Sequence, residues 1–260
     1  MIHRYYNEGQ KLNVADLNEM IVLLDRTEAE LTEVALNTWR AGLIGPPHHH
    51  DQKEQIFYIT SGNGIVKVGN ETFKVKPGDL VYVPLGMEHQ TIAGEHEALH
   101  YILFNVFNNP EKEGHGTFAE HIEKVKHIRK QQAETGKALV ENAERSASST
   151  KIPKHIDHVN KKDVDPLNST TSRMLLDRAE TERLEMVVVS RPKGSKGALE
   201  THEEKEQTFF VFSGSGIIKI SEEQALVKPG DIIFVPRNAW HCAETKDEEL
   251  SYLCLNVHII

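Results

Sequence analysis

The chain has 260 residues and a formal net charge of −9, and 38% of its residues are hydrophobic and 27% charged. This composition is typical of a soluble globular protein of one or two domains. The acidic balance disfavours nucleic-acid binding, which needs a basic face, and no long apolar run predicts a membrane span. Only Cys242 and Cys254 are present, and the N-terminus has no apolar signal segment, so we expect a cytoplasmic protein.

Short predicted strands and glycine-rich turns fill the first hundred residues. Residues 55–60 form a strand-like run that ends in the Ser-Gly-x-Gly sequence of residues 61–64, where glycine permits a sharp hairpin. Residues 79–83 form an apolar, partly β-branched run after the Lys-Pro-Gly turn at residues 76–78. Many short strands with such turns predict an all-β sandwich or barrel.

A helix is predicted after this β-rich part. Thr117 and Glu120 form a capping box, and apolar residues recur at helical spacing from Phe118 to Ile128. The segment's histidines are expected on the solvated surface, without counterparts elsewhere in the chain: His115, His121, His127, His155 and His158.

The second half of the chain repeats the first. With a shift of 152, residues 23–89 align without a gap to residues 175–241, and 28 of these 67 positions are identical. Unrelated segments would share only about four, so the sequence contains an internal duplication. The predicted domains are a first barrel at residues 1–108, a partly helical connector at residues 109–167 and a second barrel at residues 168–260.

Four residues of the first repeat predict a metal site: His48, His50, Glu54 and His89. His48 and His50 are two positions apart, so on a strand their side chains point the same way. Glu54 begins the next strand-like run, and His89 follows a Pro-Gly turn that can return it from across a barrel. Three imidazoles and a carboxylate suit a divalent transition metal such as Mn, Fe, Ni, Co or Zn, with two adjacent positions left for a substrate.

Two segments of the first repeat resemble the signature motifs of the cupin family, Gly45-Pro-Pro-His48-His-His50-x3-Glu54-x7-Gly62 and Gly78-x5-Pro84-x-Gly86-x2-His89. The resemblance covers both repeats, so the chain looks like a bicupin. It implies an all-β fold of two tandem antiparallel jelly-roll β-barrels, with a metal at the base of an internal pocket. It does not define the reaction, because cupins include isomerases, dioxygenases, decarboxylases, lyases, sugar-binding regulators and storage proteins.

The second repeat departs from this pattern at one ligand position. Its aligned residues are Glu200, His202, Glu206 and His241, so Glu200 replaces His48. The additional carboxylate favours a harder ion, and one metal ion per barrel is expected. The alternative is a degenerate second barrel that is kept for packing.

Three further residues are candidates for chemistry beyond the metal. Tyr58 shares strand parity with Glu54 and Ile56, so we expect it to face the pocket, where its phenol would donate a proton or orient a substrate. Arg40 and Arg191 lie before the ligands and would bind a substrate carboxylate. An aromatic that fills the barrel and arginines on the surface are the ordinary alternatives.

The favoured function is a metal-dependent isomerase or lyase acting on a small oxygen-rich metabolite, such as a keto or hydroxy acid or a sugar derivative. Its substrate would chelate the metal through two oxygens, with proton transfer by a side chain or water. The alternatives are a dioxygenase with a redox-active metal and a non-catalytic metal- or small-molecule-binding cupin. Because bicupins often form oligomers, the resemblance also implies a homodimer or higher homo-oligomer.

Two narrower bicupin families differ from this sequence at defined positions. The segment at residues 197–202 is similar to the metal motif of (S)-ureidoglycine aminohydrolases, but that hydrolase family carries different residues where Glu206 and His241 stand. Oxalate decarboxylases are also bicupins, but their extended tryptophan- and arginine-bearing motif is absent around His48 to Glu54.

Overall fold

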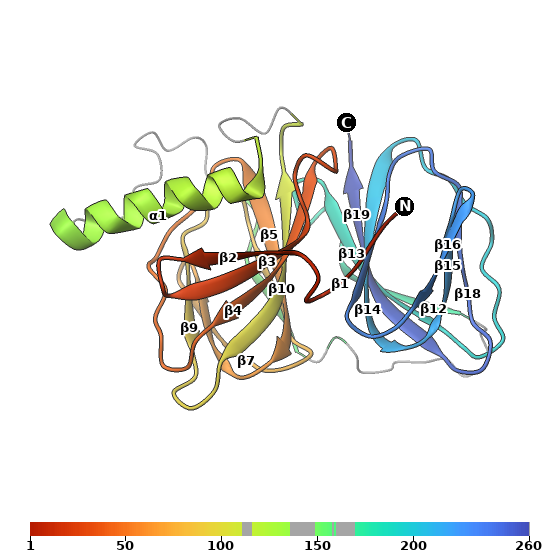
Figure 1. Cartoon of the computed structure of the whole chain (residues 1–260), viewed down its shortest axis with the longest axis horizontal. Coiled ribbons are helices and arrows are strands. Elements are labelled where there is room, and N and C mark those ends of the chain that lie inside the picture. The colour runs from red at the N-terminus through yellow and green to blue at the C-terminus, as the bar shows by residue number, and fades with distance from the viewer. Residues whose placement is uncertain (111–115, 136–148, 158, 160–169, 260) are drawn as a thin grey trace. The chain divides into compact units, whose positions relative to one another are not determined.

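The computed structural model describes residues 1–110, 116–135, 149–157, 159 and 170–259. It contains two compact units, of which the first is Gly9–Val159 and the second is Met1–Glu8 together with Asn160–Ile260. β-strands dominate both units and neighbouring strands are antiparallel, so the predicted all-β fold with two tandem barrels is confirmed (Figure 1). The unit boundaries differ from the expected division, because the described part of the connector belongs to the first unit and the first eight residues belong to the second.

The first barrel is built from two sheets. The larger sheet contains, in spatial order, β11 (Lys154–Ile156), β8 (Leu80–Val83), β5 (Lys53–Ser61), β10 (Leu99–Phe107), β4 (Thr32–Trp39), β3 (Asn18–Leu24) and β2 (Gln10–Val14). The smaller sheet contains β7 (Glu71–Val75), β6 (Gly64–Val68) and β9 (His89–Ala93). The strands predicted at residues 55–60 and 79–83 are found in β5 and β8.

The second barrel repeats this arrangement except for β2, which has no counterpart among its described strands. Its larger sheet contains β1 (Ile2–Tyr5), β17 (Asp231–Val235), β14 (Lys205–Gly214), β19 (Leu250–His258), β13 (Leu184–Arg191) and β12 (Thr171–Leu176). Its smaller sheet contains β16 (Glu223–Val227), β15 (Gly216–Ile220) and β18 (His241–Glu244). The common order of the shared strands in both barrels follows from the sequence duplication.

Alternate residues of the strands face the barrel interior. In β5, Phe57 and Ile59 belong to the first hydrophobic core, and in β14 the equivalent Phe209 and Val211 belong to the second. A hairpin turn follows β5 at Gly62, which has a φ of 76°, and a Cβ there would lie 2.0 Å from a backbone carbonyl oxygen. Glycine is therefore required at this turn.

The predicted helix is α1 (Phe118–Thr135), which lies beside β2 in Figure 1. Its capping box is confirmed: the Thr117 N–H donates to Glu120 Oε2 at 2.8 Å, and the Glu120 N–H donates to Thr117 Oγ1 at 3.2 Å. Phe118, Ile122 and Val125 join the core of the first unit. The helix thus covers the first barrel with its apolar face. No helix in the described ranges is long and apolar enough to cross a membrane.

The first strand of each repeat completes the barrel of the other repeat. β1 pairs with β17 in the second unit, whereas β11, which follows the connecting helix, pairs with β8 in the first. The shift of 152 that aligns the repeats also places His155 of β11 on His3 of β1.

These two histidines make equivalent contacts. His3 Nε2 lies 3.2 Å from Asp231 Oδ2, and His155 Nε2 lies 3.1 Å from Asp79 Oδ2. The expectation of an unmatched, solvated His155 was therefore wrong. The strands are too short to reveal the correspondence in a sequence comparison.

Deletion of residues 1–5 is predicted to lower the melting temperature of the second unit by several degrees. The deletion leaves β17 without its outer partner and exposes an unpaired strand edge. His3→Gln, which keeps the strand, should change the melting temperature by much less, because the His3 side chain that contacts Asp231 is partly exposed. Differential scanning calorimetry measures both, and an unchanged transition in the deletion variant would contradict the proposed role of β1.

Candidate metal centre

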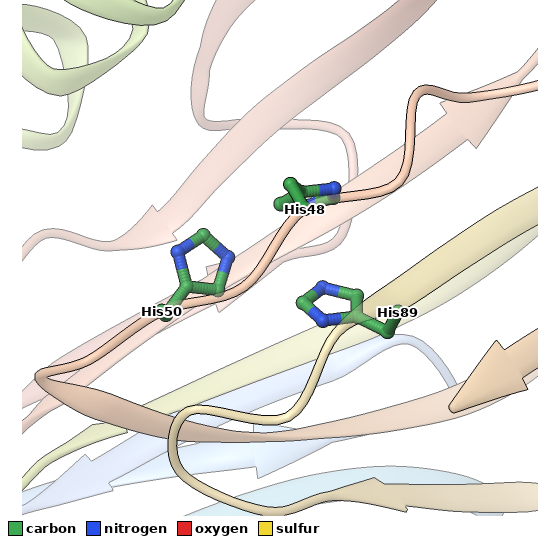
Figure 2. Close-up of side chains that lie close together, drawn as sticks. All are labelled: His48, His50 and His89. Atoms are coloured by element: carbon green, nitrogen blue, oxygen red, sulfur yellow. The ribbon is translucent and has the colours of Figure 1, made fainter. Parts of the chain in front are cut away.

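Three predicted ligands of the first barrel converge (Figure 2). The backbones of His48 and His89 pair through two hydrogen bonds, of 3.0 and 2.8 Å, which set their side chains next to each other. The ring centroids of His48 and His89 lie 4.2 Å apart, and the His50 ring lies 5.1 and 5.4 Å from them. One ligand atom from each ring lies within 4.8 Å of the other two, so this group could hold a metal ion.

The hydrogen bonds around the rings favour the metal-binding tautomer. His48 Nδ1 lies 3.0 Å from the Pro46 carbonyl oxygen, and His89 Nδ1 lies 3.1 Å from the Met87 carbonyl oxygen. A carbonyl oxygen only accepts hydrogen bonds, so each Nδ1 carries a hydrogen, and the lone pair of each neutral ring is on Nε2. Burial lowers the pKa of His50 and His89 well below the usual value, which keeps both rings neutral.

The structure does not bring Glu54 into this group. Lys53, Gln55 and Phe57 line the cavity beside the histidines, whereas Glu54 lies on the opposite face of β5. There its Oε2 accepts a hydrogen bond of 2.6 Å from the Tyr82 hydroxyl. The chain bends at residues 51–52, between His50 and the strand, so strand parity cannot be carried from the histidines into β5.

The same parity error affects Tyr58. It was expected to face the pocket with Ile56, but neither residue lines the cavity, and both lie on the strand face of Glu54. Burial raises the pKa of Tyr58 to about 12. The phenol within the cavity belongs instead to Tyr101 of β10. Its alignment with Tyr252 in the second repeat was the available sequence signal.

Gln55 occupies the position where Glu54 was expected. Gln55 Nε2 donates to Asn105 Oδ1 at 2.7 Å, and Asn105 Nδ2 donates to Glu33 Oε1 at 2.6 Å. A carboxylate only accepts, so Glu33 fixes the orientation of both amides. Gln55 Oε1 is left buried and without a hydrogen-bond partner among the described residues. An unpaired buried oxygen costs about 1–3 kcal/mol, and a bound cation would relieve that cost.

The second barrel has a related but more open group. Ligand atoms of Glu200, His202 and His241 lie within 4.8 Å of one another, and Glu200 is exposed where its counterpart His48 is half-buried. Glu206, which was also predicted as a ligand, is buried and does not join the group.

The glutamine network is present in this barrel as well. Gln207 Nε2 donates to Asn256 Oδ1 at 2.8 Å, and Asn256 Nδ2 donates to Glu185 at 3.2 Å. Gln207 Oε1 again has no hydrogen-bond partner within the described ranges. Both repeats therefore present a buried glutamine oxygen held by an Asn–Glu pair.

The first site opens into a cavity of about 70 Å³, which has room for several waters or a small ligand. Its wall joins the three histidines to the polar residues Asn18, Asn37, Thr91 and Tyr101 and to the α1 residues Phe118, His121, Ile122, Val125 and Arg129. The expectation of a solvated surface role for His121 was therefore wrong. The connecting helix thus forms part of the wall of this cavity.

The predicted substrate-binding arginines have different environments. Arg40 is exposed just after β4 and does not line the first cavity. Arg191 lies at the end of β13, where its Nε donates to the Tyr252 hydroxyl at 3.3 Å. Arg129 was missed, although it follows Val125 by four residues and so continues the inward face of α1.

Comparison with known proteins identifies the family. The Cupin_2 model, described as a cupin domain, matches residues 37–105 and 186–257, which together exceed half of the chain. The fold is similar to oxalate decarboxylase from Bacillus subtilis, with a TM-score of 0.65 and 17% identity over 100% of this chain and 78% of that chain. It is also similar to AerE from Microcystis aeruginosa, with a TM-score of 0.65 and 12% identity over 98% and 99% of the two chains.

One curated relative is similar over a short segment. The uncharacterised protein MJ1618 of Methanocaldococcus jannaschii is 42% identical over 43 residues, which are 16% of this chain. The match spans about a third (34%) of that protein's length. At 17% and 12% sequence identity, the similarity to these two solved structures establishes the fold of this chain.

The metal-free protein is predicted to lose stability as the pH falls below about 6.5, the usual histidine pKa in an unfolded chain. Above that pH, His50 and His89 are neutral in both states. Below it the unfolded chain binds protons that the folded protein, with its lowered pKa values, does not, so the free energy of unfolding decreases. Melting temperatures between about pH 8 and pH 5 measure this trend. The control is His50→Gln/His89→Gln, and an equal slope in that variant would contradict the assignment.

Proposed function

Because the chain belongs to the cupin family, with two cupin domains, we propose that it is a metal-dependent enzyme of the isomerase or lyase type that acts on a small anionic metabolite. The observation that carries this proposal is the convergence of three imidazoles and the unpaired Gln55 oxygen on one cavity. The reaction is assigned to the first barrel, because its site is the more buried of the two and α1 covers it.

The residues fit a divalent transition metal. In the first barrel the Nε2 atoms of His48, His50 and His89 and the Oε1 atom of Gln55 would hold it, and the unpaired Gln55 oxygen is the specific structural reason. When bound, the metal would polarise substrate oxygens and stabilise developing negative charge. In the second barrel the corresponding set is Glu200, His202, Gln207 and His241.

The charges around the first site favour an anionic substrate. Imidazoles and an amide bind a metal in their neutral forms, so the four proposed ligands there would leave the charge of a divalent ion uncompensated, whereas Glu200 would reduce it in the second barrel. Arg129 adds a guanidinium to the wall of the first cavity. Lys53 is already paired with the buried Glu33, at 3.3 Å. A keto or hydroxy acid fits this field better than a neutral sugar derivative.

Tyr101 is proposed to take the role expected of Tyr58. It lines the cavity, and its ring stacks on Phe57 with a centroid distance of 4.7 Å. Burial raises its pKa, so the phenol stays protonated at neutral pH and can donate a hydrogen bond or a proton to a substrate oxygen. The apolar side chains of α1 keep bulk water away from this step.

The purified protein is predicted to bind two equivalents of divalent metal. His50→Ala and His202→Ala should each lose one equivalent, because each removes a ligand from a different barrel. Elemental analysis by mass spectrometry after dialysis against Mn²⁺, Fe²⁺, Ni²⁺, Co²⁺ or Zn²⁺ gives the stoichiometry and the preferred ion. Full retention of metal by His50→Ala would contradict the first site.

Two neighbouring substitutions distinguish the proposed ligand from the one that sequence spacing predicts. Gln55→Leu should weaken metal binding in the first barrel by about tenfold or more, because it removes the Oε1 ligand. Glu54→Gln should leave the metal affinity unchanged, because this side chain faces Tyr82 rather than the cavity. Isothermal titration in a His202→Ala background isolates the first site. The reverse ranking would show that Glu54 is the ligand.

Turnover is predicted for a small keto or hydroxy acid and should require the first barrel. The metal-loaded protein can be incubated with a panel of such acids and followed by proton NMR, with His50→Ala and His202→Ala as matched variants. Loss of turnover in His50→Ala with retention in His202→Ala is the expected result. The opposite pattern would place the reaction in the second barrel.

A further inference from the structure

A directional chain of hydrogen bonds runs from α1 to Tyr101 in the first barrel. Arg129 Nη1 donates to Asn18 Oδ1 at 3.3 Å, and Asn18 Nδ2 donates to Asn37 Oδ1 at 2.7 Å. Asn37 Nδ2 then donates to the Tyr101 hydroxyl oxygen at 2.8 Å. A guanidinium can only donate, so Arg129 determines which end of each amide faces the next residue.

The Tyr101 oxygen accepts from two sides. Besides Asn37, the Trp39 Nε1–H donates to it at 3.0 Å. Two donors occupy both lone pairs of a phenol, so the hydroxyl hydrogen must point elsewhere. The Thr91 Oγ1 lies 3.4 Å from the Tyr101 oxygen, so the two hydroxyls make a long, weak hydrogen bond in which either can be the donor. A ligand oxygen at a normal hydrogen-bond distance in the cavity would compete well with Thr91 for the Tyr101 hydrogen.

We infer that Tyr101 binds an anionic oxygen of the substrate as a hydrogen-bond donor, and that Arg129, Asn18 and Asn37 are positioning residues that fix this role. This inference deepens the proposed function and rests on it for the identity of the ligand. The cavity then offers a hydrogen-bond acceptor at Gln55 and a hydrogen-bond donor at Tyr101. A substrate with adjacent carboxylate and carbonyl or hydroxyl oxygens matches both ends, through the metal and through Tyr101.

Among the residues that the structure describes, the second barrel has no equivalent chain. At the shift of 152, Val189 stands where Asn37 does, Ala243 where Thr91 does, and Arg191 where Trp39 does. Arg191 donates directly to Tyr252 instead. The network that orients the glutamine is thus duplicated, whereas the chain that orients the tyrosine is specific to the first barrel. The substitution Asn37→Val therefore places in the first barrel the residue that the second barrel has at the equivalent position, Val189.

The first test uses the metal-free protein and reads the phenol directly. With ¹³Cζ-labelled tyrosine, Tyr101→Phe assigns the Tyr101 resonance. Asn37→Val and Arg129→Gln should shift that resonance, because a glutamine can offer either its oxygen or its nitrogen to Asn18. Arg129→Lys keeps an obligate donor and should preserve the shift. Asn105→Leu, which disrupts the other network, is the control that should leave it unchanged.

The second test measures acetate binding to the Mn²⁺-loaded protein in the His202→Ala background, with uncharged acetamide as the comparison ligand. Tyr101→Phe, Asn37→Val and Arg129→Gln should each weaken acetate binding by about tenfold, the usual scale for a lost hydrogen bond to a charged group. Mn²⁺ binding should be unchanged, and Arg129→Lys should bind acetate nearly as well as the unsubstituted protein.

Two results would overturn the inference. One is an unshifted Tyr101 resonance together with unchanged acetate affinity in Asn37→Val and Arg129→Gln. The other is equal impairment in Arg129→Lys and Arg129→Gln, because the polarity of the donor would then be irrelevant. If the protein binds no metal, the proposed function fails, but the resonance measurement on the metal-free protein still decides whether the chain orients Tyr101.

Discussion

The buried carboxylate of Glu33 is the constraint on which the first metal centre depends. It is fully buried and is held by Arg26 at 2.9 Å and Lys53 at 3.3 Å, which offset its charge. Glu33 also accepts a hydrogen bond from the Asn105 amide nitrogen, and the Asn105 amide oxygen accepts one from the Gln55 amide nitrogen. Because a carboxylate cannot donate, the Asn105 amide nitrogen points toward Glu33 and the Gln55 amide nitrogen points toward Asn105. The Gln55 oxygen is therefore the end of that amide that faces the cavity. The charge of Glu33, acting through Asn105, thus orients the neutral Gln55 side chain so that its oxygen can bind a metal.

The duplication shows which parts of this design the copies share. Glu185, Asn256 and Gln207 repeat the network of Glu33, Asn105 and Gln55. The two sites differ in what surrounds this common base: Glu200 adds a negative charge in the second barrel, and α1 covers the cavity of the first. The unequal roles proposed for the two barrels follow from these differences and not from the Glu–Asn–Gln network that both barrels share. The helix connects the repeats and also forms part of the first cavity.

The sequence predicted the fold class, the duplication and the convergence of His48, His50 and His89, because these depend on local spacing and on turns that the sequence marks. The fourth position was not predictable from spacing. The chain bends between His50 and β5, and that bend decides whether Glu54 or Gln55 faces inward. The exchanged strands β1 and β11 and the inward position of Arg129 depend on tertiary packing, for which three- and four-residue segments carry little sequence signal.

The most direct measurement of the central claim is the position of a metal in crystals soaked with Mn²⁺, located by anomalous diffraction. The predicted result is an anomalous peak in the first barrel within about 2.0–2.4 Å of the Nε2 atoms of the three histidines and of Gln55 Oε1, with Glu54 still bonded to Tyr82. A peak coordinated by Glu54, or a rotated Gln55 amide with its nitrogen toward the histidines, would contradict the role assigned to Glu33.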